Sequence, residues 1–206
     1  MILYKVVGKG TLLLSSLREN DPVSVIGPLG NGFTMCKPDE KPLLISGGMG
    51  VAPLFFFAQR LHKVQNQKTK MFLGFTTSQE VILIDELKDL NIDLSLTTED
   101  GSLGVPGLVT DLLDEYLRQK FTKKPVMYAC GPPLMLKKIA HMAAISKLRC
   151  YVSLEGSMAC GLGICQGCAV KAGNNQNKPY YYICQDGPVF SSEMIAWGGY
   201  VNGSSA

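Results

Sequence analysis

The stretch LLISGGMGVAPL (residues 43–54) decides the fold of this chain. A short apolar run leads into three glycines, and an apolar, helix-like stretch follows. Gly48 and Gly50 would let a phosphate approach the backbone, where the N–H groups and dipole of the helix start would bind it. Pro53 replaces the third glycine of the G-x-G-x-x-G motif, and it fits a first helical turn. We expect a phosphate-binding strand–turn–helix unit, with a ligand-free glycine turn as the alternative.

The alternation of strand and helix continues along the chain. The expected strands cover residues 43–46, 71–77, 93–98, 126–131 and 150–156, and the expected helices cover 54–64, 86–90, 108–119 and 134–147. This alternation predicts a parallel sheet covered on both faces. Ligands bind at the carboxyl ends of such strands, where ACGPPLM (129–135) places Gly131 and where TEDGSLGVPGLVT (98–110) begins. We therefore expect a nicotinamide dinucleotide at Gly48, Gly50 and Gly131.

The residues after the second expected strand of this α/β region bear on the choice of nucleotide. A 2′-phosphate calls for an arginine or a lysine at this place. The chain instead has Ser78, Gln79 and Glu80 after MFLGFTT. The sequence thus favours NAD(H) over NADP(H).

Four cysteines near the carboxyl end form the second motif. Three lie in MACGLGICQGCAV with the pattern C-x4-C-x2-C, and the fourth lies in YYYICQDGPVF. They are Cys160, Cys165, Cys168 and Cys184. This is the plant-type spacing for a [2Fe-2S] cluster. Gly161, Gly163 and Gly167 would let the loop turn sharply, so we expect a cluster that carries one electron at a time.

Other readings of the cysteines are weaker. A zinc site would need two C-x2-C pairs or added histidines, and His62 and His141 lie far upstream on helical patterns. Disulfides are rare in reducing compartments, and nothing in the chain resembles a secretory signal. A buried, inert thiol is the expectation for each of the other cysteines. These are Cys36, Cys130 and Cys150.

Length and composition set broad limits. The chain has 206 residues, 46% of them hydrophobic, which fits one or two globular domains. The net charge of +3 is small and the basic residues are scattered, so neither nucleic acid nor a membrane surface is an expected partner. No apolar run reaches the roughly 18 residues of a membrane span. We expect a soluble protein of the cytoplasm.

The first 37 residues read as part of a β-barrel. Ile2 to Val7 and Val23 to Ile26 are β-rich runs that end in glycine turns, which favours antiparallel strands. The fold class expected for the whole chain is therefore multi-domain, α/β plus β. Its three domains are a truncated antiparallel barrel (1–37), a parallel α/β nucleotide-binding domain (38–156) and a small [2Fe-2S] domain (157–206).

Taken together, these parts resemble the ferredoxin reductase family. The similarity is greatest to its members that serve as electron-transfer subunits of NAD-linked (class 1B type) dihydroorotate dehydrogenases in bacteria. The matching stretches are YKVVGKGT (4–11), LSSL (14–17), GPLGNGF (27–33), SGGMGVAP (46–53), ACGPPLM (129–135), LEGSMACGLGICQGCAV (154–170) and ICQDGPVF (183–190). The last two are the most specific, because most ferredoxin reductases have no such cluster at the carboxyl end.

The resemblance implies cofactors and a partner. It implies FAD in the barrel, NAD at the α/β domain and a [2Fe-2S] cluster at the four cysteines. The flavin would lie at Leu3, Tyr4, Lys5, Gly10 and Thr11, and Cys130 would lie near the nicotinamide. The partner would be an FMN-containing catalytic subunit that oxidises dihydroorotate to orotate in pyrimidine biosynthesis, in a dimer of heterodimers. No catalytic residue is expected on this chain, nor activity on dihydroorotate alone.

The chain departs from the family at its start. The family's barrel begins with further strands and an Arg-Pro-x-Ser type flavin motif, and neither is present here. Because open strand edges expose unpaired backbone groups, we expect this chain to bind FAD weakly or not at all. We also expect its first 37 residues to be poorly ordered or to pair with another chain.

Two alternative functions remain open from the sequence. One is a subunit of another flavin and iron–sulfur complex, such as a hydrogenase or a ferredoxin reductase linked to NAD(P). The other is a ferredoxin-like carrier, which is disfavoured because the α/β region would then have no use.

Overall fold

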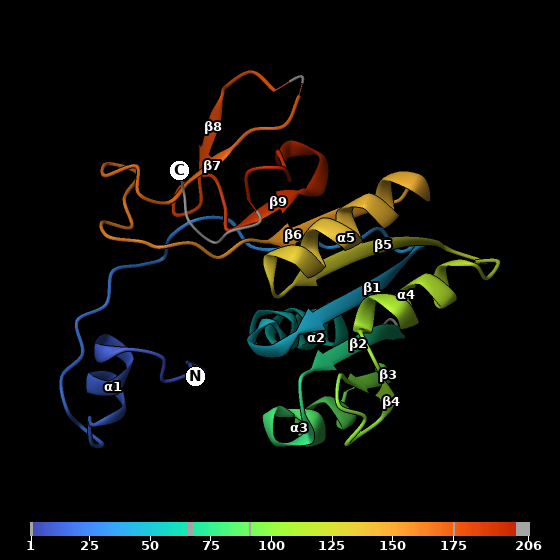
Figure 1. The fold of residues 1–206 in the computed structure, drawn as a ribbon, viewed down its shortest axis with the longest axis horizontal. Coiled ribbons are helices and arrows are strands. Elements are labelled where there is room, and N and C mark those ends of the chain that lie inside the picture. Colours follow the sequence, from blue (N-terminus) through green and yellow to red (C-terminus); the bar gives the residue numbers. More distant parts are fainter. Residues whose placement is uncertain (1, 66–67, 91, 175, 201–206) are drawn as a thin grey trace.

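A seven-stranded sheet forms the body of the molecule (Figure 1). The computed structural model describes residues 2–65, 68–90, 92–174 and 176–200. The sheet has the strand order β4-β3-β2-β1-β5-β6-β9. Its strands are β1 (Glu40–Gly47), β2 (Thr69–Phe75), β3 (Ile92–Thr98), β4 (Val105–Pro106), β5 (Lys124–Cys130), β6 (Arg149–Ser153) and β9 (Val189–Ser191). All neighbours pair in parallel except β6 and β9, which are antiparallel, so the parallel sheet predicted from the sequence is confirmed.

Helices cover both faces of this sheet. They are α2 (Val51–Gln65), α3 (Ile84–Lys88), α4 (Val109–Leu117) and α5 (Pro133–Ile145). Successive residues of a strand point to opposite faces. Leu43 and Ile45 of β1 accordingly pack in the core beneath α4 and α5, whereas Leu44 packs in the core beneath α2 and α3. All three are fully buried, and each such burial contributes roughly 1.5–3 kcal/mol.

The chain order creates a crevice in the middle of the sheet. After β1 the chain builds β2, β3 and β4 on one side, and then crosses to add β5 and β6 on the other. The strand order therefore reverses between β1 and β5. Open α/β sheets bind ligands at such a reversal, beyond the carboxyl ends of the strands. Gly47 ends β1 and Cys130 ends β5, so both predicted glycine turns meet at this point.

The carboxyl-terminal lobe packs onto the same body. It contains a hairpin of β7 (Ala169–Lys171) and β8 (Tyr180–Tyr182), and its next strand, β9, joins the edge of the main sheet. Val170, Tyr181 and Ile183 belong to the same core as Leu43. The domain boundary expected at residues 156/157 is thus crossed by a continuous core and by β9, and it stays a prediction.

The amino-terminal strands were predicted wrongly. Residues 2–7 and 23–26 form no strand, and α1 (Lys9–Ser15) lies between them. Gly8 is its N-cap, and the Thr11 hydroxyl accepts the Gly8 N–H at 3.2 Å. None of the residues of α1 is buried. A β-rich run becomes a strand only beside a partner strand, and the described residues place no sheet edge beside this segment (Figure 1).

Short 3₁₀ helices complete the fold. They are η1 (Gly48–Gly50), η2 (Ser78–Glu80) and η3 (Ser192–Met194). In the described part of the chain, no helix is long and apolar enough to cross a membrane.

Candidate functional site

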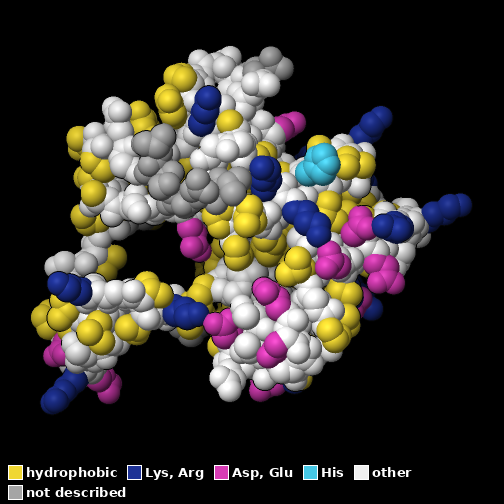
Figure 2. Space-filling model, in the orientation of Figure 1, with side chains coloured by type: hydrophobic (Ala, Val, Ile, Leu, Met, Phe, Trp, Pro, Cys, Tyr) yellow, Lys and Arg dark blue, Asp and Glu magenta, His cyan; other side chains and the backbone are white. Residues whose placement is uncertain are grey.

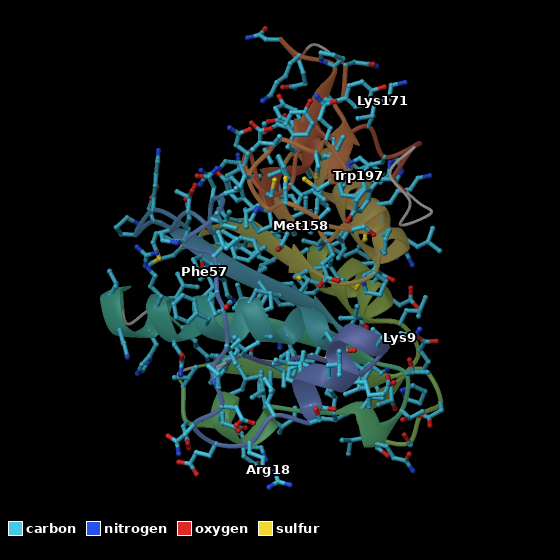
Figure 3. All side chains as sticks on the ribbon, turned by 90° about the vertical axis from the view of Figure 1, so that its left-hand side faces the viewer. Lys9, Arg18, Phe57, Met158, Lys171 and Trp197 are labelled. Carbon is cyan, nitrogen blue, oxygen red and sulfur yellow. The ribbon has the colours of Figure 1, made fainter. Side chains whose placement is uncertain are left out.

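The four cysteines predicted to bind iron come together in two pairs. The Cys168 thiol lies 3.3 Å from the Cys184 sulfur. The Cys165 N–H donates to the Cys160 sulfur at 3.4 Å, and the Cys165 side chain also bonds to that sulfur. Figure 3 shows sulfur atoms close together near the labelled Met158. Two pairs of thiols suit the two irons of a [2Fe-2S] cluster, because each iron takes two of the four ligands.

Three glycines were predicted to let the loop around these thiols turn sharply. Two of them have the positive φ that such turns use. Gly161 and Gly163 have φ values of +69° and +76°, which glycine adopts without steric cost. At Gly163 a Cβ would lie 2.6 Å from the Gln185 Oε1 atom. The third predicted position, Gly167, does not have a positive φ, and Gln166 takes the left-handed conformation instead.

Backbone N–H groups point at the sulfurs of the loop. The Cys165 and Leu162 N–H groups donate to Cys160, and the Gly163 N–H donates to Cys184 at 3.2 Å. The donation from Cys165 and Leu162 lowers the pKa of Cys160 to about 6. Burial, in contrast, raises the pKa of Cys184. Thiolate is the form that binds metal, so Cys160 is prepared for ligation before iron arrives.

The four thiols form no disulfide and approach one another only in pairs. Within the described residues, no three His, Cys, Asp or Glu side chains gather as ligands of a single metal ion. The Cys168–Cys184 distance of 3.3 Å is far longer than a disulfide bond of about 2.05 Å. None of the cysteines is in a disulfide. Two contacting thiol pairs are compatible with the four thiolates that a [2Fe-2S] cluster needs.

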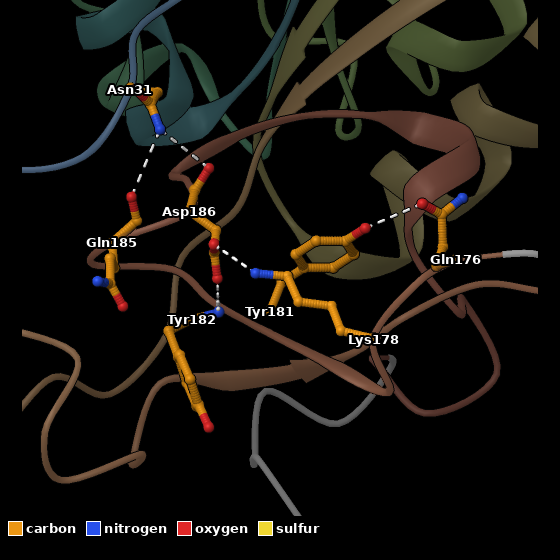
Figure 4. A network of polar contacts seen from close by, with 7 residues as sticks. All are labelled: Asn31, Gln176, Lys178, Tyr181, Tyr182, Gln185 and Asp186. Carbon is orange, nitrogen blue, oxygen red and sulfur yellow. Dashed lines mark hydrogen bonds and ion pairs between the residues drawn. The ribbon is translucent and has the colours of Figure 1, made fainter.

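A polar network holds the segment that carries Cys184 (Figure 4). The Asp186 carboxylate accepts the Tyr182 N–H at 2.7 Å and pairs with Lys178 at 2.6 Å. The Asn31 amide donates to the carbonyls of Gln185 and Asp186. No pattern in the sequence indicates this network, because Asn31 and Asp186 are far apart along the chain.

A cavity of about 560 Å³ lies at the carboxyl ends of β1, β2 and β3. Its lining includes Gly48 and also residues 107–110, so the third strand end predicted from residues 98–110 is part of the same site. Gly48 has a φ of +52°, and a Cβ there would meet no atom within 4 Å. The Gly48 backbone is therefore open to a ligand, as a phosphate cradle requires.

The other two glycines predicted to bind nucleotide have a packing role. A Cβ on Gly50 would lie 2.1 Å from the Cys130 carbonyl oxygen, and one on Gly131 would lie 2.5 Å from the Met135 methyl carbon. Both glycines line a second cavity beside the first, of about 520 Å³. They allow the two turns to approach each other, while Gly48 presents its backbone to the cavity.

Polar side chains around the first cavity suit a dinucleotide. Thr110 lines the cavity, and its buried hydroxyl has no hydrogen-bond partner among the described residues. Burying such a hydroxyl unpaired is unfavourable, so a ligand that bonds to it would remove this cost. Glu80 and Glu99 also line the cavity. Lys5 pairs with Glu80 at 2.9 Å, so this lysine is not a free cation for a 2′-phosphate.

Cys130 lies at the end of β5 and is 1% exposed. Burial raises its pKa to about 12, with the Glu155 carboxylate acting in the same direction. It is therefore a neutral thiol at physiological pH. Its expected position near a nicotinamide stays a prediction.

The residues assigned to FAD by resemblance do not form a cradle. Leu3 and Tyr4 are each 37% exposed, and Gly10 lies within α1. The Thr11 hydroxyl is used at the start of α1, while Lys5 reaches the nucleotide cavity. Figure 2 shows open space between this segment and the α/β body. No step through a flavin can be derived from these residues.

Two family descriptions match the chain. Residues 44–141 match the oxidoreductase NAD-binding domain. Residues 155–196 match the iron–sulfur cluster binding domain of dihydroorotate dehydrogenase B. The first range contains the nucleotide cavity's glycine turns, and the second contains all four paired cysteines.

Curated relatives cover nearly the whole chain. The electron transfer subunit of dihydroorotate dehydrogenase B (NAD(+)) from Caldanaerobacter subterraneus is 39% identical, over 94% of this chain and 74% of its own length. The same subunit from Desulforamulus reducens is 37% identical, over 95% and 74%. That from Streptococcus pneumoniae serotype 4 is 38% identical, over 94% and 75%.

Solved structures agree on the fold. The structure of the NADH-dependent reduced ferredoxin–NADP oxidoreductase, an electron-bifurcating flavin enzyme, matches with a TM-score of 0.80 and 34% identity. The match covers 95% of this chain and 68% of the chain in that structure. The ferredoxin reductase of carbazole 1,9a-dioxygenase matches with a TM-score of 0.52 and 21% identity over 59% of this chain and 38% of its own. The second likeness concerns the fold alone.

Proposed function

This chain belongs to the family of electron transfer subunits of NAD(+)-linked dihydroorotate dehydrogenase B, and on that premise we propose how its residues serve the reaction. It is an oxidoreductase subunit that carries electrons between a catalytic subunit and NAD(+). The cofactors that the family and the similar structure support are a [2Fe-2S] cluster, FAD and NAD, although residues 3–11 of this chain do not form a flavin site by themselves. The observation that carries the proposal is the presence of two thiol pairs and a dinucleotide cavity on one chain.

The cysteine loop would hold the cluster. Cys160 and Cys165 would bind one iron, and Cys168 and Cys184 the other, because these are the pairs already in contact. A bound cluster supplies one-electron transfer. The N–H groups that point at Cys160 and Cys184 would stabilise the negative charge on the sulfurs, and such bonds tune the potential of a cluster.

The cavity at the carboxyl ends of the strands would hold NAD(H). The open backbone of Gly48 would receive the pyrophosphate, and the Thr110 hydroxyl would bond to a polar atom of the nucleotide. A bound nicotinamide would supply hydride transfer. Glu80 and Glu99 would favour ribose hydroxyls over a 2′-phosphate. The Thr110 hydroxyl would thus gain the partner that the described residues do not provide.

The partner would be an FMN-containing subunit that oxidises dihydroorotate to orotate. The relatives are named as the electron transfer subunit of a dehydrogenase. Such a subunit needs a second subunit that supplies the electrons. The assembly we propose is a dimer of heterodimers. Exposed apolar side chains of the cysteine loop would lie at the contact, among them Met158, Leu162 and Ile164.

Reconstitution tests this function. The chain mixed with the catalytic subunit should support dihydroorotate-dependent reduction of NAD(+), followed by the absorbance of NADH. The chain alone should show none. Native mass spectrometry should detect two copies of each subunit. Oxidation of dihydroorotate by the chain alone would contradict the proposal.

The solved structure at 34% identity favours one alternative. Its enzyme works with ferredoxin and NADP, so a subunit of a ferredoxin-linked complex is the second candidate. A direct comparison separates the two. The leading proposal predicts reduction of the chain by the dihydroorotate-oxidising subunit and slow reduction by ferredoxin, whereas the alternative predicts the reverse.

A further inference from the structure

A groove lies between α5 and the segment 191–197, and we call it the α5 groove. Its volume is about 930 Å³, within the range of roughly 300–1,000 Å³ that small-molecule sites have. It lies toward the amino ends of the strands, because Arg149 on its lining is the first residue of β6. It shares no lining residue with the nucleotide cavity. The groove is therefore separate from the site described above.

The lining of the α5 groove is basic. Its basic side chains are Lys137, His141, Lys147 and Arg149. Glu193 is the one acidic residue on the lining, and Arg149 is already paired with Glu40. The ion pairs among the described residues include none for Lys137 or Lys147. Figure 2 shows Lys and Arg side chains on the α4–α5 part of the surface, interspersed with Asp and Glu. Gathered like charges repel one another, so an anion in the groove would be stabilised.

Small side chains and an aromatic ring form much of the remaining lining, beside Ser191 and Ser192. Ala140, Ala143 and Ala144 of α5 line the groove, and side chains this small leave space above the helix. Trp197 also lines it; it lies in the carboxyl-terminal lobe (Figure 3). Its indole N–H donates to the Ser192 carbonyl at 2.8 Å, which fixes the ring. A fixed aromatic ring beside small apolar residues suits a planar ligand group.

We propose that the α5 groove binds a small organic anion in which a planar ring carries a phosphate group, the chemical class of the nucleoside monophosphates. Lys137 would bind the phosphate as a charge-assisted hydrogen-bond donor, and Lys147, beyond the end of α5, would add to the positive field of the groove. The ring would lie against Trp197 and the alanines of α5. This inference goes beyond the proposed function and does not rest on it, because neither the cysteines nor the nucleotide cavity takes part.

The single tryptophan of the chain makes the proposal testable. We would titrate the cofactor-loaded protein with adenosine 5′-monophosphate in the presence of saturating NAD(+), which under the proposed function would occupy the nucleotide cavity. The emission of Trp197 should change in a saturable way. Inorganic phosphate, which lacks the ring, should bind at least about tenfold more weakly if the ring adds a contact of ordinary strength.

Charge variants give the test a direction. Lys137→Ala with Lys147→Ala should weaken binding about tenfold or more, because bonds to a charged group are lost. Glu193→Gln should tighten binding, since it removes the one acid of the lining. Lys63→Ala serves as the matched control, because Lys63 lies on α2, across the sheet. Isothermal titration calorimetry with the same nucleotide gives an independent affinity.

Three results would overturn the proposal. The first is an unchanged Trp197 emission at millimolar nucleotide. The second is a change that saturating NAD(+) abolishes, since the nucleotide would then bind in the other cavity. The third is equal affinity for inorganic phosphate and the nucleotide, because the ring would then make no contact.

Discussion

The α/β body and the cysteine loop (residues 157–168) both carry a cofactor site, but they are held in different ways. In β1 the last six residues are all buried, and the glycine turn that follows is fixed by packing against β5. In the cysteine loop only Cys168 is buried, and Ile164 is 77% exposed. The nucleotide cavity is therefore formed by the hydrophobic core, whereas the loop has little core of its own, and we expect a bound cluster to order it.

Removing one cluster ligand should have the largest effect and should affect the loop alone. Cys168→Ser is expected to abolish cluster binding, because the second iron loses one of its two thiolates. Iron analysis after anaerobic purification should fall from about two atoms per chain to near zero. NADH binding should persist in this variant. The control is Cys36→Ala, a change in the core on the α2 side of the sheet, and this variant should keep its iron. A variant that kept a full cluster would show that Cys168 is not a ligand.

A core substitution in the α/β body should lower the free energy of unfolding far more than a substitution in the cysteine loop. Leu113 on α4 is fully buried, so Leu113→Ala should cost about 2–5 kcal/mol of unfolding free energy. Ile164→Ala in the cysteine loop should stay within about 0.5 kcal/mol, because the side chain is in solvent. Chemical denaturation measures both. Equal losses of unfolding free energy in the two variants would contradict the exposure of Ile164.

The pKa values predict which thiol reacts first in cluster-free protein. The pKa of Cys160 is lowered to about 6 and that of Cys130 is raised to about 12, and the thiolate is the reactive form. The rate of iodoacetamide modification at Cys160 should rise through pH 6 and level off above pH 7. At pH 7 Cys160 should react at least about tenfold faster than Cys130. Peptide mass spectrometry locates the adducts, and preferential labelling of Cys130 would contradict the assignment.

The smallest expected effect concerns the nucleotide cavity. Glu80→Gln with Glu99→Gln removes two acidic groups and releases Lys5 from its ion pair, so a 2′-phosphate gains a cation. The ratio of NADH to NADPH affinity should fall by about tenfold, as expected for one charged contact. Glu86→Gln on α3, outside the cavity, is the control. An unchanged ratio would place the ribose elsewhere.

The sequence predicted the body well because its signals are local. Apolar runs and helical periodicity located β1, β2, β3, β5 and β6 with the helices between them, and the cysteine spacing located the loop. Strand formation near residues 2–7 was predicted wrongly because pairing depends on a partner strand rather than on β propensity. Thr110 and Asn31 were missed for a similar reason, since only the folded chain brings them to the cavity and to Asp186.

Electron paramagnetic resonance of the anaerobically reduced protein tests the central claim most directly. We predict the signal of one [2Fe-2S] cluster, at about one spin per chain, with iron and sulfide in equal amounts. The Cys168→Ser variant should lack the signal. Stoichiometric zinc without iron or sulfide in anaerobically purified protein would contradict the account.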